Sequence, residues 1–115
     1  MLFRSQDYIA KSKATAAYQE IASGKTAYEL NASQGLTLTA ASDIGLASAT
    51  ATCSAITVTA PDSTGAATGA IKCTVATPAR LGTGASIQFD RTTTGLYTCV
   101  TANFASASYK PSGCS

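Results

Sequence analysis

The feature that most constrains this chain is one stretch with helical periodicity near its amino end. Small apolar residues recur there at alternating steps of four and three, which places them on one narrow helix face. They are Ala10, Ala14, Ala17, Ile21, Gly24 and Tyr28. Polar residues such as Lys11, Thr15 and Gln19 fall on the opposite face, as expected for a helix that lies on a core. The sequence therefore predicts one helix over residues 5–31 that supports the rest of the domain.

The apolar face of this helix is small in volume, so a packing partner can approach its backbone closely. Gly24 inside a helix costs about 1 kcal/mol relative to alanine. Such a cost is understandable where close packing uses the missing side chain. We therefore expect a close contact at Gly24.

Composition limits the chain to one small domain with a weakly charged surface. Its 115 residues fit the usual size of a single domain. Charged residues make up 12% of the chain, the net charge is +2, and the basic residues are scattered along the sequence. Nucleic-acid binding through phosphate neutralisation therefore has little support.

The four cysteines form an even set with no C-x-x-C pair and no histidine in the chain. They are Cys53, Cys73, Cys99 and Cys114. Zinc ligands normally cluster in sequence, so two disulfides are the better interpretation. Disulfides imply a periplasmic or extracellular compartment.

An exported protein should begin with a targeting segment, and residues 1–4 are neither a signal peptide nor a membrane span. No run of about 18 apolar residues occurs anywhere in the chain. We therefore expect a truncated form, in which residues 1–4 are partly vector-derived and a hydrophobic segment ahead of Ser5 has been removed.

Residues 32–52 lack a firm period and predict a long, irregular connection. A small polar cluster and Gly35 indicate the end of the helix after Asn31. Loops of this length inside a compact domain are often functional, which makes the connection a candidate contact surface. The alternative is that it covers one edge of a sheet.

From residue 53 onward the apolar period changes to two, which indicates β-strands. Alternating segments occupy residues 55–59, 70–76, 86–92 and 96–101, with turn residues between them. We expect these segments to form an antiparallel sheet within residues 53–101.

A hairpin centred near Ser63 would bring Cys53 opposite Cys73, which is the geometry that a disulfide requires. Cys53 is out of step with Ile56 and Val58 on this strand. The mismatch predicts a bulge or an early strand end between Cys53 and Ile56.

The two ends of the chain carry a family resemblance. The helix opens with the run Tyr8-Ile9-Ala10-Lys11-Ser12. The last strand carries Gly95-Leu96-Tyr97-Thr98-Cys99, ahead of a terminal Lys110-Pro111-Ser112-Gly113-Cys114. In order and spacing the chain resembles bacterial type IV pilins of the a subclass, although its middle portion matches only in kind. The resemblance implies an α+β fold with an N-terminal helix on a four-stranded antiparallel sheet and two disulfides.

The resemblance also implies roles for particular residues of a pilin globular domain at 5–115. Cys99 and Cys114 would bound a C-terminal loop, residues 99–114, whose contents are variable and exposed. Residues 5–31 would be the soluble half of the long pilin helix, without its membrane-spanning, filament-core half. The resemblance does not fix the pairing of Cys53 and Cys73.

Within this loop, Phe104, Tyr109 and Lys110 are candidate receptor contacts. For the two aromatic residues the alternative is that they anchor the loop to the core. Ser115 is similar to the terminal serine that carries an O-linked glycan in some pilins, against the alternative of a plain polar chain end. The segment Asn31-Ala32-Ser33 fits an N-glycosylation sequon, but the polar end of a helix is the better account of it.

The function that the resemblance implies is a structural subunit, the major pilin, of a type IV pilus. Such an extracellular fibre supports adhesion, twitching motility or DNA uptake, and its subunits reside in the inner membrane before assembly. The implied partners are other pilin subunits, through the missing hydrophobic helix, and a host receptor or surface.

Two other functions are alternatives to the major pilin. A DNA-binding minor pilin would need scattered basic residues to converge, namely Lys72, Arg80, Arg91 and Lys110. A type II secretion pseudopilin can carry calcium, whereas Asp43, Asp62 and Asp90 stand singly rather than in a ligand-rich run. The sequence disfavours both direct DNA binding and a calcium site.

The sequence argues against an enzyme. It has no histidine, which is the usual general base and the commonest metal ligand, and no glycine-rich phosphate loop follows a strand. The carboxylates could form a catalytic pair only if the fold gathered them, and surface solvation is their ordinary role. They are Asp7, Glu20, Glu29, Asp43, Asp62 and Asp90. We expect no cofactor and no metal.

Overall fold

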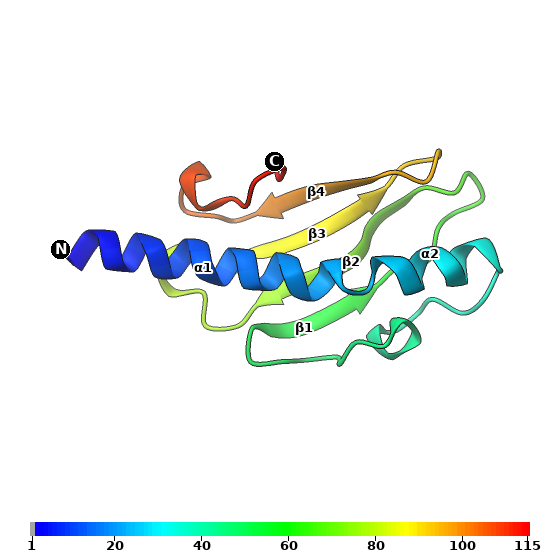
Figure 1. The fold of residues 1–115 in the computed structure, drawn as a ribbon, viewed down its shortest axis with the longest axis horizontal. Helices are drawn as coiled ribbons and strands as arrows, with labels where there is room; N and C mark the ends of the chain where they lie inside the picture. The colour runs from blue at the N-terminus through cyan, green and yellow to red at the C-terminus, as the bar shows by residue number, and fades with distance from the viewer. Residues whose placement is uncertain (1) are drawn as a thin grey trace.

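A rod of two helices lies across one face of a four-stranded antiparallel sheet (Figure 1). The computed structural model describes residues 2–115, with side chains from Asp7 onward, and Met1 lies outside the described residues. The helices are α1 (Leu2–Ala22) and α2 (Lys25–Ser33), and the strands are β1 (Cys53–Val58), β2 (Ala67–Val75), β3 (Ser86–Arg91) and β4 (Tyr97–Ala102). Neighbouring strands are consecutive in the chain. The predicted fold class is confirmed.

Over residues 2–115, three short 3₁₀ turns lie outside these helices and strands. They are η1 (Ala41–Ile44), η2 (Ala79–Leu81) and η3 (Ala107–Tyr109). Helix α1 begins at Leu2, so no break in the helix separates residues 2–4 from the residues that follow. That residues 1–4 are vector-derived stays a prediction, and for Met1 it lies outside the described residues.

The prediction of one helix over 5–31 is wrong at Ser23 and Gly24, where the helix is interrupted. The Ser23 hydroxyl donates to the Glu20 carbonyl at 2.6 Å, and the Gly24 amide bonds instead to Ile21 O at 3.1 Å. Competition of this kind is how serine disturbs a helical ladder. The rod nevertheless continues in nearly the same direction through α2 (Figure 1).

The close contact expected at Gly24 is present. A Cβ atom there would lie 2.7 Å from Ile44 Cδ1 and 3.0 Å from Leu46 Cδ1. The partner is therefore the connection between α2 and β1 rather than the sheet.

The small apolar helix face is buried as predicted. Ala10, Ala14, Ala17, Ile21 and Tyr28 are each at most 2% exposed. They meet the inner face of the sheet, where every second residue is apolar and buried; examples are Ile71, Cys73, Ile87 and Phe89. Alanine side chains let the helix lie close to the sheet, which is how so small a domain buries a continuous core.

Helix α2 ends in a Schellman motif two residues beyond the predicted end. Gly35 adopts φ +67°, the Leu36 amide donates to Asn31 O at 2.8 Å, and the Gly35 amide donates to Ala32 O at 3.3 Å. The Asn31 side chain donates to Asp43 O at 2.8 Å. This bond uses the amide that an N-linked glycan would modify.

The predicted irregularity at the start of β1 is a register shift between Cys53 and Ala55. Ile56 pairs with Cys73, whereas Cys53 pairs with Val75. The expectation that Cys53 lies directly opposite Cys73 is therefore wrong, because the hairpin register places Ile56 opposite Cys73. The extra residue at the bulge returns Cys53 to the buried face that carries Cys73 and Val75. The two cysteines still form a disulfide across this bulge, with their Cα atoms 5.4 Å apart.

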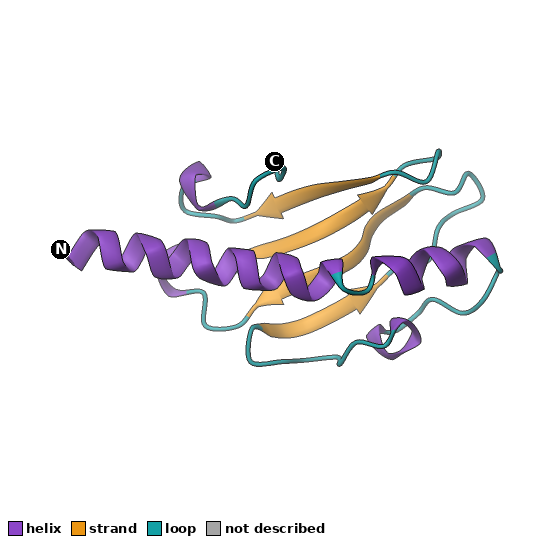
Figure 2. Cartoon of the chain, in the orientation of Figure 1, coloured by secondary structure: helices purple, strands orange, loops and turns teal. Residues whose placement is uncertain are grey.

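Both outer edges of the sheet are partly covered. The connection between α2 and β1 runs along β1, where the Ile56 amide donates to Ser48 O at 2.8 Å (Figure 2). At the other edge Ser115 bonds to β4, accepting from Thr101 N at 2.8 Å and donating its amide to Cys99 O at 3.1 Å. Covering of this kind protects a small sheet from edge-to-edge pairing. Residues 48–50 of the connection therefore cover the β1 edge, and a contact role for residues 32–52 stays a prediction.

Candidate assembly and display site

The loop between Cys99 and Cys114 is held at both ends of its sequence. Its disulfide joins β4 to the terminal segment, with the Cα atoms 4.5 Å apart, and Cys99 and Cys114 form a parallel bridge. Together with Cys53–Cys73 this gives the two predicted pairs, and no cysteine is free.

Tyr109 anchors the middle of this loop to helix α1. It is only 7% exposed, and its hydroxyl donates to Asp7 Oδ1 at 2.8 Å and accepts from Arg80 Nε at 3.2 Å. Arg80 Nε also lies 2.8 Å from Asp7 Oδ1. The Tyr109 hydroxyl and the Arg80 guanidinium lower the pKa of Asp7, so this carboxylate stays ionised to lower pH than usual.

A second contact fixes the start of the loop against the η2 segment. The Ala105 amide donates to Leu81 O at 2.7 Å, and the backbone of Asn103 and Ala105 lies directly over Gly82. Phe104 is partly buried and contacts the core. Both aromatic residues of the loop therefore lie where they anchor it.

The other predicted display residues lie at the surface. Lys110 is half-exposed directly after η3, and Ser115 is exposed beside β4. Receptor contact by Phe104, Tyr109 or Lys110, and glycosylation of Ser115, stay predictions.

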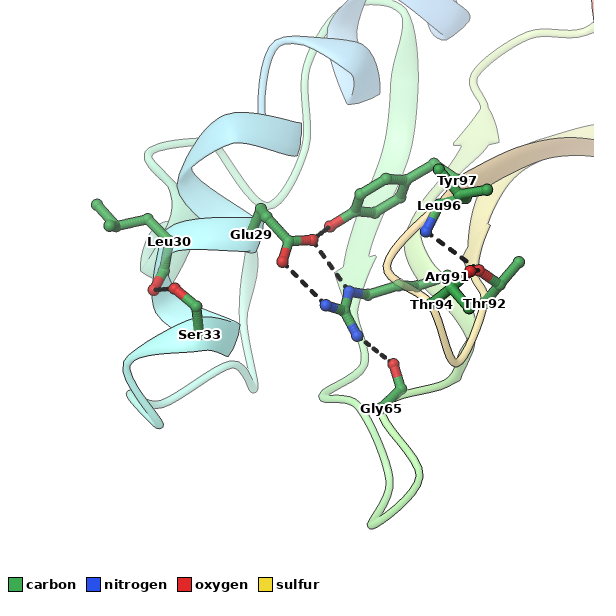
Figure 3. Close-up of polar contacts among 9 residues, drawn as sticks. All are labelled: Glu29, Leu30, Ser33, Gly65, Arg91, Thr92, Thr94, Leu96 and Tyr97. Atoms are coloured by element: carbon green, nitrogen blue, oxygen red, sulfur yellow. Dashed lines mark hydrogen bonds and ion pairs between the residues drawn. The ribbon is translucent and has the colours of Figure 1, made fainter.

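A three-residue clamp at the opposite end of the domain joins α2 to β3 and β4 (Figure 3). Arg91 makes a two-pronged ion pair with Glu29, with Nε–Oε1 at 3.0 Å and Nη2–Oε2 at 2.9 Å. Tyr97 OH donates to Glu29 Oε1 at 2.8 Å, and Arg91 Nη1 donates to Gly65 O in the β1–β2 connection. The side chain of Arg91 is 13% exposed and that of Glu29 is 41% exposed.

Electrostatics within the clamp follow from this geometry. The Arg91 hydrogen bonds hold the pKa of Glu29 below its ordinary value, with a smaller contribution from Tyr97. Burial and the neighbouring Glu29 carboxylate raise the pKa of Tyr97. Paired, partly desolvated charges of this kind fix orientation more than they add free energy.

The clamp was not predicted from the sequence, although one signal was present. Arg91 shares strand parity with the buried residues Ile87 and Phe89, so its side chain starts on the inner face. A guanidinium in that position needs an anionic partner. Local patterns could not identify the partner, because Glu29 is 62 residues away.

A family model for pilin, described as a bacterial filament protein, matches residues 10–115. The chain belongs to the pilin family. The match includes both disulfides, all four strands and most of α1. A search of curated proteins finds no match.

Membership of the pilin family indicates the general function of the chain. Its family consists of structural subunits rather than enzymes, and its members assemble with other pilin subunits into an extracellular pilus fibre. None of the helices over residues 2–115 is long and apolar enough to cross a membrane.

The basic residues considered for DNA binding do not converge in this pilin. Arg80 and Arg91 lie at opposite ends of the sheet, and each is engaged with a carboxylate. Lys72 lies in the middle of the outer sheet face, between Thr57 and Gln88. Lys110 follows Tyr109, whose hydroxyl bonds to Arg80.

The remaining carboxylates each serve a local structural role. Asp43 accepts from the amides of Thr39 and Ala40, and these bonds lower its pKa. Asp62 accepts from Thr64, which likewise lowers its pKa.

Asp90 and Glu20 complete the set. Asp90 accepts from Gly69 N at 2.8 Å, where the register between β2 and β3 shifts. Glu20 accepts from the Thr50 hydroxyl at 2.9 Å. Among the described residues, no three His, Cys, Asp or Glu side chains gather as a metal site.

Proposed function

We propose that this domain is the coat of the major subunit of a type IV pilus of the a subclass. The observation that carries the proposal is the fixing of the disulfide-bounded loop to both the sheet and α1, through Cys99–Cys114 and the Tyr109–Asp7–Arg80 contacts. A coat that is sheared and bent must keep its exposed loop folded. In the fibre α1 faces the axis, and the polar outer face of the sheet, which includes Thr57 and Lys72, faces the solvent.

Such a fibre serves surface adhesion, twitching motility and DNA uptake. The domain presents its weakly charged surface and the exposed parts of residues 100–113 to the surroundings. In the complete subunit a hydrophobic helix ahead of residue 5 joins the filament core and holds the subunit in the inner membrane before assembly. Family membership and the extension of α1 beyond the strands support this part (Figure 1).

Fibres sheared from cells that make the chain test the proposal. An antibody against the domain should detect the chain as the most abundant protein of the sheared fraction, and deleting its gene should remove the fibres and the twitching zones. A trace amount in fibres that survive the deletion would indicate a minor subunit. Its absence from the fibres, with the chain retained in a secretion complex, would contradict a pilus role.

Receptor contact by the terminal loop is a separate part of the proposal. Lys110→Ala should reduce adhesion without a change in unfolding temperature, because the Lys110 side chain is half-exposed. Tyr109→Phe should instead lower stability, because it removes the bonds to Asp7 and Arg80. Full adhesion by Lys110→Ala fibres would contradict a contact at that residue.

Glycosylation of Ser115 completes the proposed display surface. Its hydroxyl lies at the exposed end of the chain, with a 3.5 Å contact to Cys99 O. Intact-mass measurement of protein from native fibres should show an added hexose-type mass that Ser115→Ala removes. An unmodified mass would contradict it.

A further inference from the structure

The large apolar side chains that the structure leaves exposed gather at the two ends of the domain. Over residues 7–115 they are Tyr8 and Ile9 near the start of α1, and Leu30, Leu36 and Leu96 around α2 and the β3–β4 turn. Each is at least 52% exposed. The domain is 51 Å long and at most 25 Å wide, and these two groups lie at opposite ends of its long axis (Figure 1).

Charge also separates along this axis. The two ion pairs among the described side chains, Asp7–Arg80 and Glu29–Arg91, each cancel within one end. At the end of Tyr8 and Ile9 the other charged side chains over residues 7–115 are basic. Lys11 and Lys13 lie on α1, and Lys110 follows Tyr109, which bonds to Asp7.

The opposite end is acidic. Asp43 lies beside Asn31 of α2, Asp62 lies in the β1–β2 connection, and Asp90 precedes Arg91 in β3. The lysine that the described residues place near them is Lys25, whose ammonium is 4.7 Å from the Phe89 ring centre. The donors to Asp43 and Asp62 are backbone amides and a threonine hydroxyl, which carry no charge. These hydrogen bonds therefore do not neutralise the two carboxylates.

We propose that these two ends are complementary docking surfaces for copies of this chain. The basic end around Tyr8 and Lys11 of one copy receives the acidic end around Leu96 and Asp62 of the next. Opposite charges around apolar centres favour this contact over a contact between two like ends.

The symmetry of such a contact agrees with a fibre. Two different surfaces of one molecule form a heterologous interface, which propagates into an open filament unless it closes into a ring. The inference rests on the proposed function, because only a pilus subunit needs repeated contacts along the fibre.

A photo-crosslinking amino acid at position 8 tests the contact in isolated fibres and in concentrated solutions of the domain. The expected crosslinks join position 8 to peptides of another copy that contain Leu36 or Leu96. The control position is Thr57, which is exposed on the outer sheet face and should give few interchain products. Crosslinks between two copies of the position 8 region, equal yields from position 57, or no interchain product from position 8 in fibres would each overturn the proposal.

Charge reversal provides the matched test in solution. Lys11→Glu at the basic end and Ser63→Lys at the acidic end should each lower the crosslink yield about fivefold, the effect of one exposed charge pair. An equimolar mixture should recover yield, because the Glu of one variant meets the Lys of the other. No loss in either variant, or no recovery in the mixture, would contradict the pairing.

The outcomes separate the two proposals. A chain that is absent from fibres defeats the proposed function, whatever the domain does in solution. A chain that is present in fibres but crosslinks through other surfaces defeats only the docking inference.

Discussion

Replacing Gly82 by alanine should unfold the contact between the terminal loop and the η2 segment. Gly82 has φ +136° and ψ 137°, a conformation that is essentially restricted to glycine. A Cβ atom there would lie 2.2 Å from Asn103 O and 2.9 Å from Ala105 N. These are backbone atoms, which cannot rotate away, and Ala105 N is already bonded to Leu81 O.

Two costs add in this variant. Backbone strain at such a position costs about 1–3 kcal/mol, and displacing a well-packed segment costs about 1–3 kcal/mol more. We therefore expect Gly82→Ala to lose about 4 kcal/mol of unfolding free energy. At about 4 °C per kcal/mol for a domain of this size, the midpoint should fall by about 16 °C.

Thermal and urea unfolding, followed by circular dichroism with the disulfides intact, measure this loss. Gly45→Ala is the matched control, because Gly45 also has a positive φ, +77°, but a Cβ there meets no atom within 4 Å. The control should lose about 1 kcal/mol, from backbone strain alone. If the two variants differ by less than about 1 kcal/mol, the described docking of the loop is wrong.

Three further changes test the clamp, the core and the hairpin. Glu29→Gln should lower the unfolding free energy by about 1 kcal/mol, less than the loss of a fully buried ion pair, because the Glu29 side chain is partly exposed. A double-mutant cycle with Tyr97→Phe should show coupling between the two side chains. The folded-state pKa of Glu29 is lowered, so this stabilisation is present above the ordinary glutamate pKa and is lost as pH falls through the folded-state pKa. If the urea midpoints of the original protein and Glu29→Gln stay apart at low pH, this expectation is contradicted. Burial raises the pKa of Tyr28 to about 12, so the contribution of this tyrosine to the unfolding free energy is complete below the ordinary tyrosine pKa and is lost as pH rises from there toward 12. The loss of stability at alkaline pH should therefore be smaller in Tyr28→Phe. An unchanged loss would argue against burial of the hydroxyl. Replacing Cys53 and Cys73 together by alanine removes a disulfide between residues 20 positions apart. The unfolding free energy from urea titration should fall by about 3 kcal/mol. A loss below about 1 kcal/mol would show that the disulfide contributes little to stability.

Features set by neighbours in the sequence were predictable. The helix face from Ala10 to Tyr28 follows from period alone, and the bulge after Cys53 follows from the parity of Ile56 and Val58. The disulfide of Cys53 with Cys73 follows because a hairpin brings these two strands together, even though the residue directly opposite Cys73 is Ile56.

Features set by distant residues were not predictable. The partners of the close contact at Gly24 are Ile44 and Leu46, which lie in the connection after α2. The clamp depends on Arg91 meeting Glu29, and no local pattern encodes which strand end lies beside which helix turn. Tertiary contacts of this kind override local propensity.

The central claim is that this domain coats a pilus with α1 toward the fibre axis. Helical reconstruction of sheared native fibres by cryo-electron microscopy measures this directly. We predict a repeating unit that contains both disulfides, with α1 inside and Thr57 and Lys72 on the outer surface. A repeating unit that is not this chain, or one in which α1 faces the solvent and the sheet faces the axis, would contradict the claim.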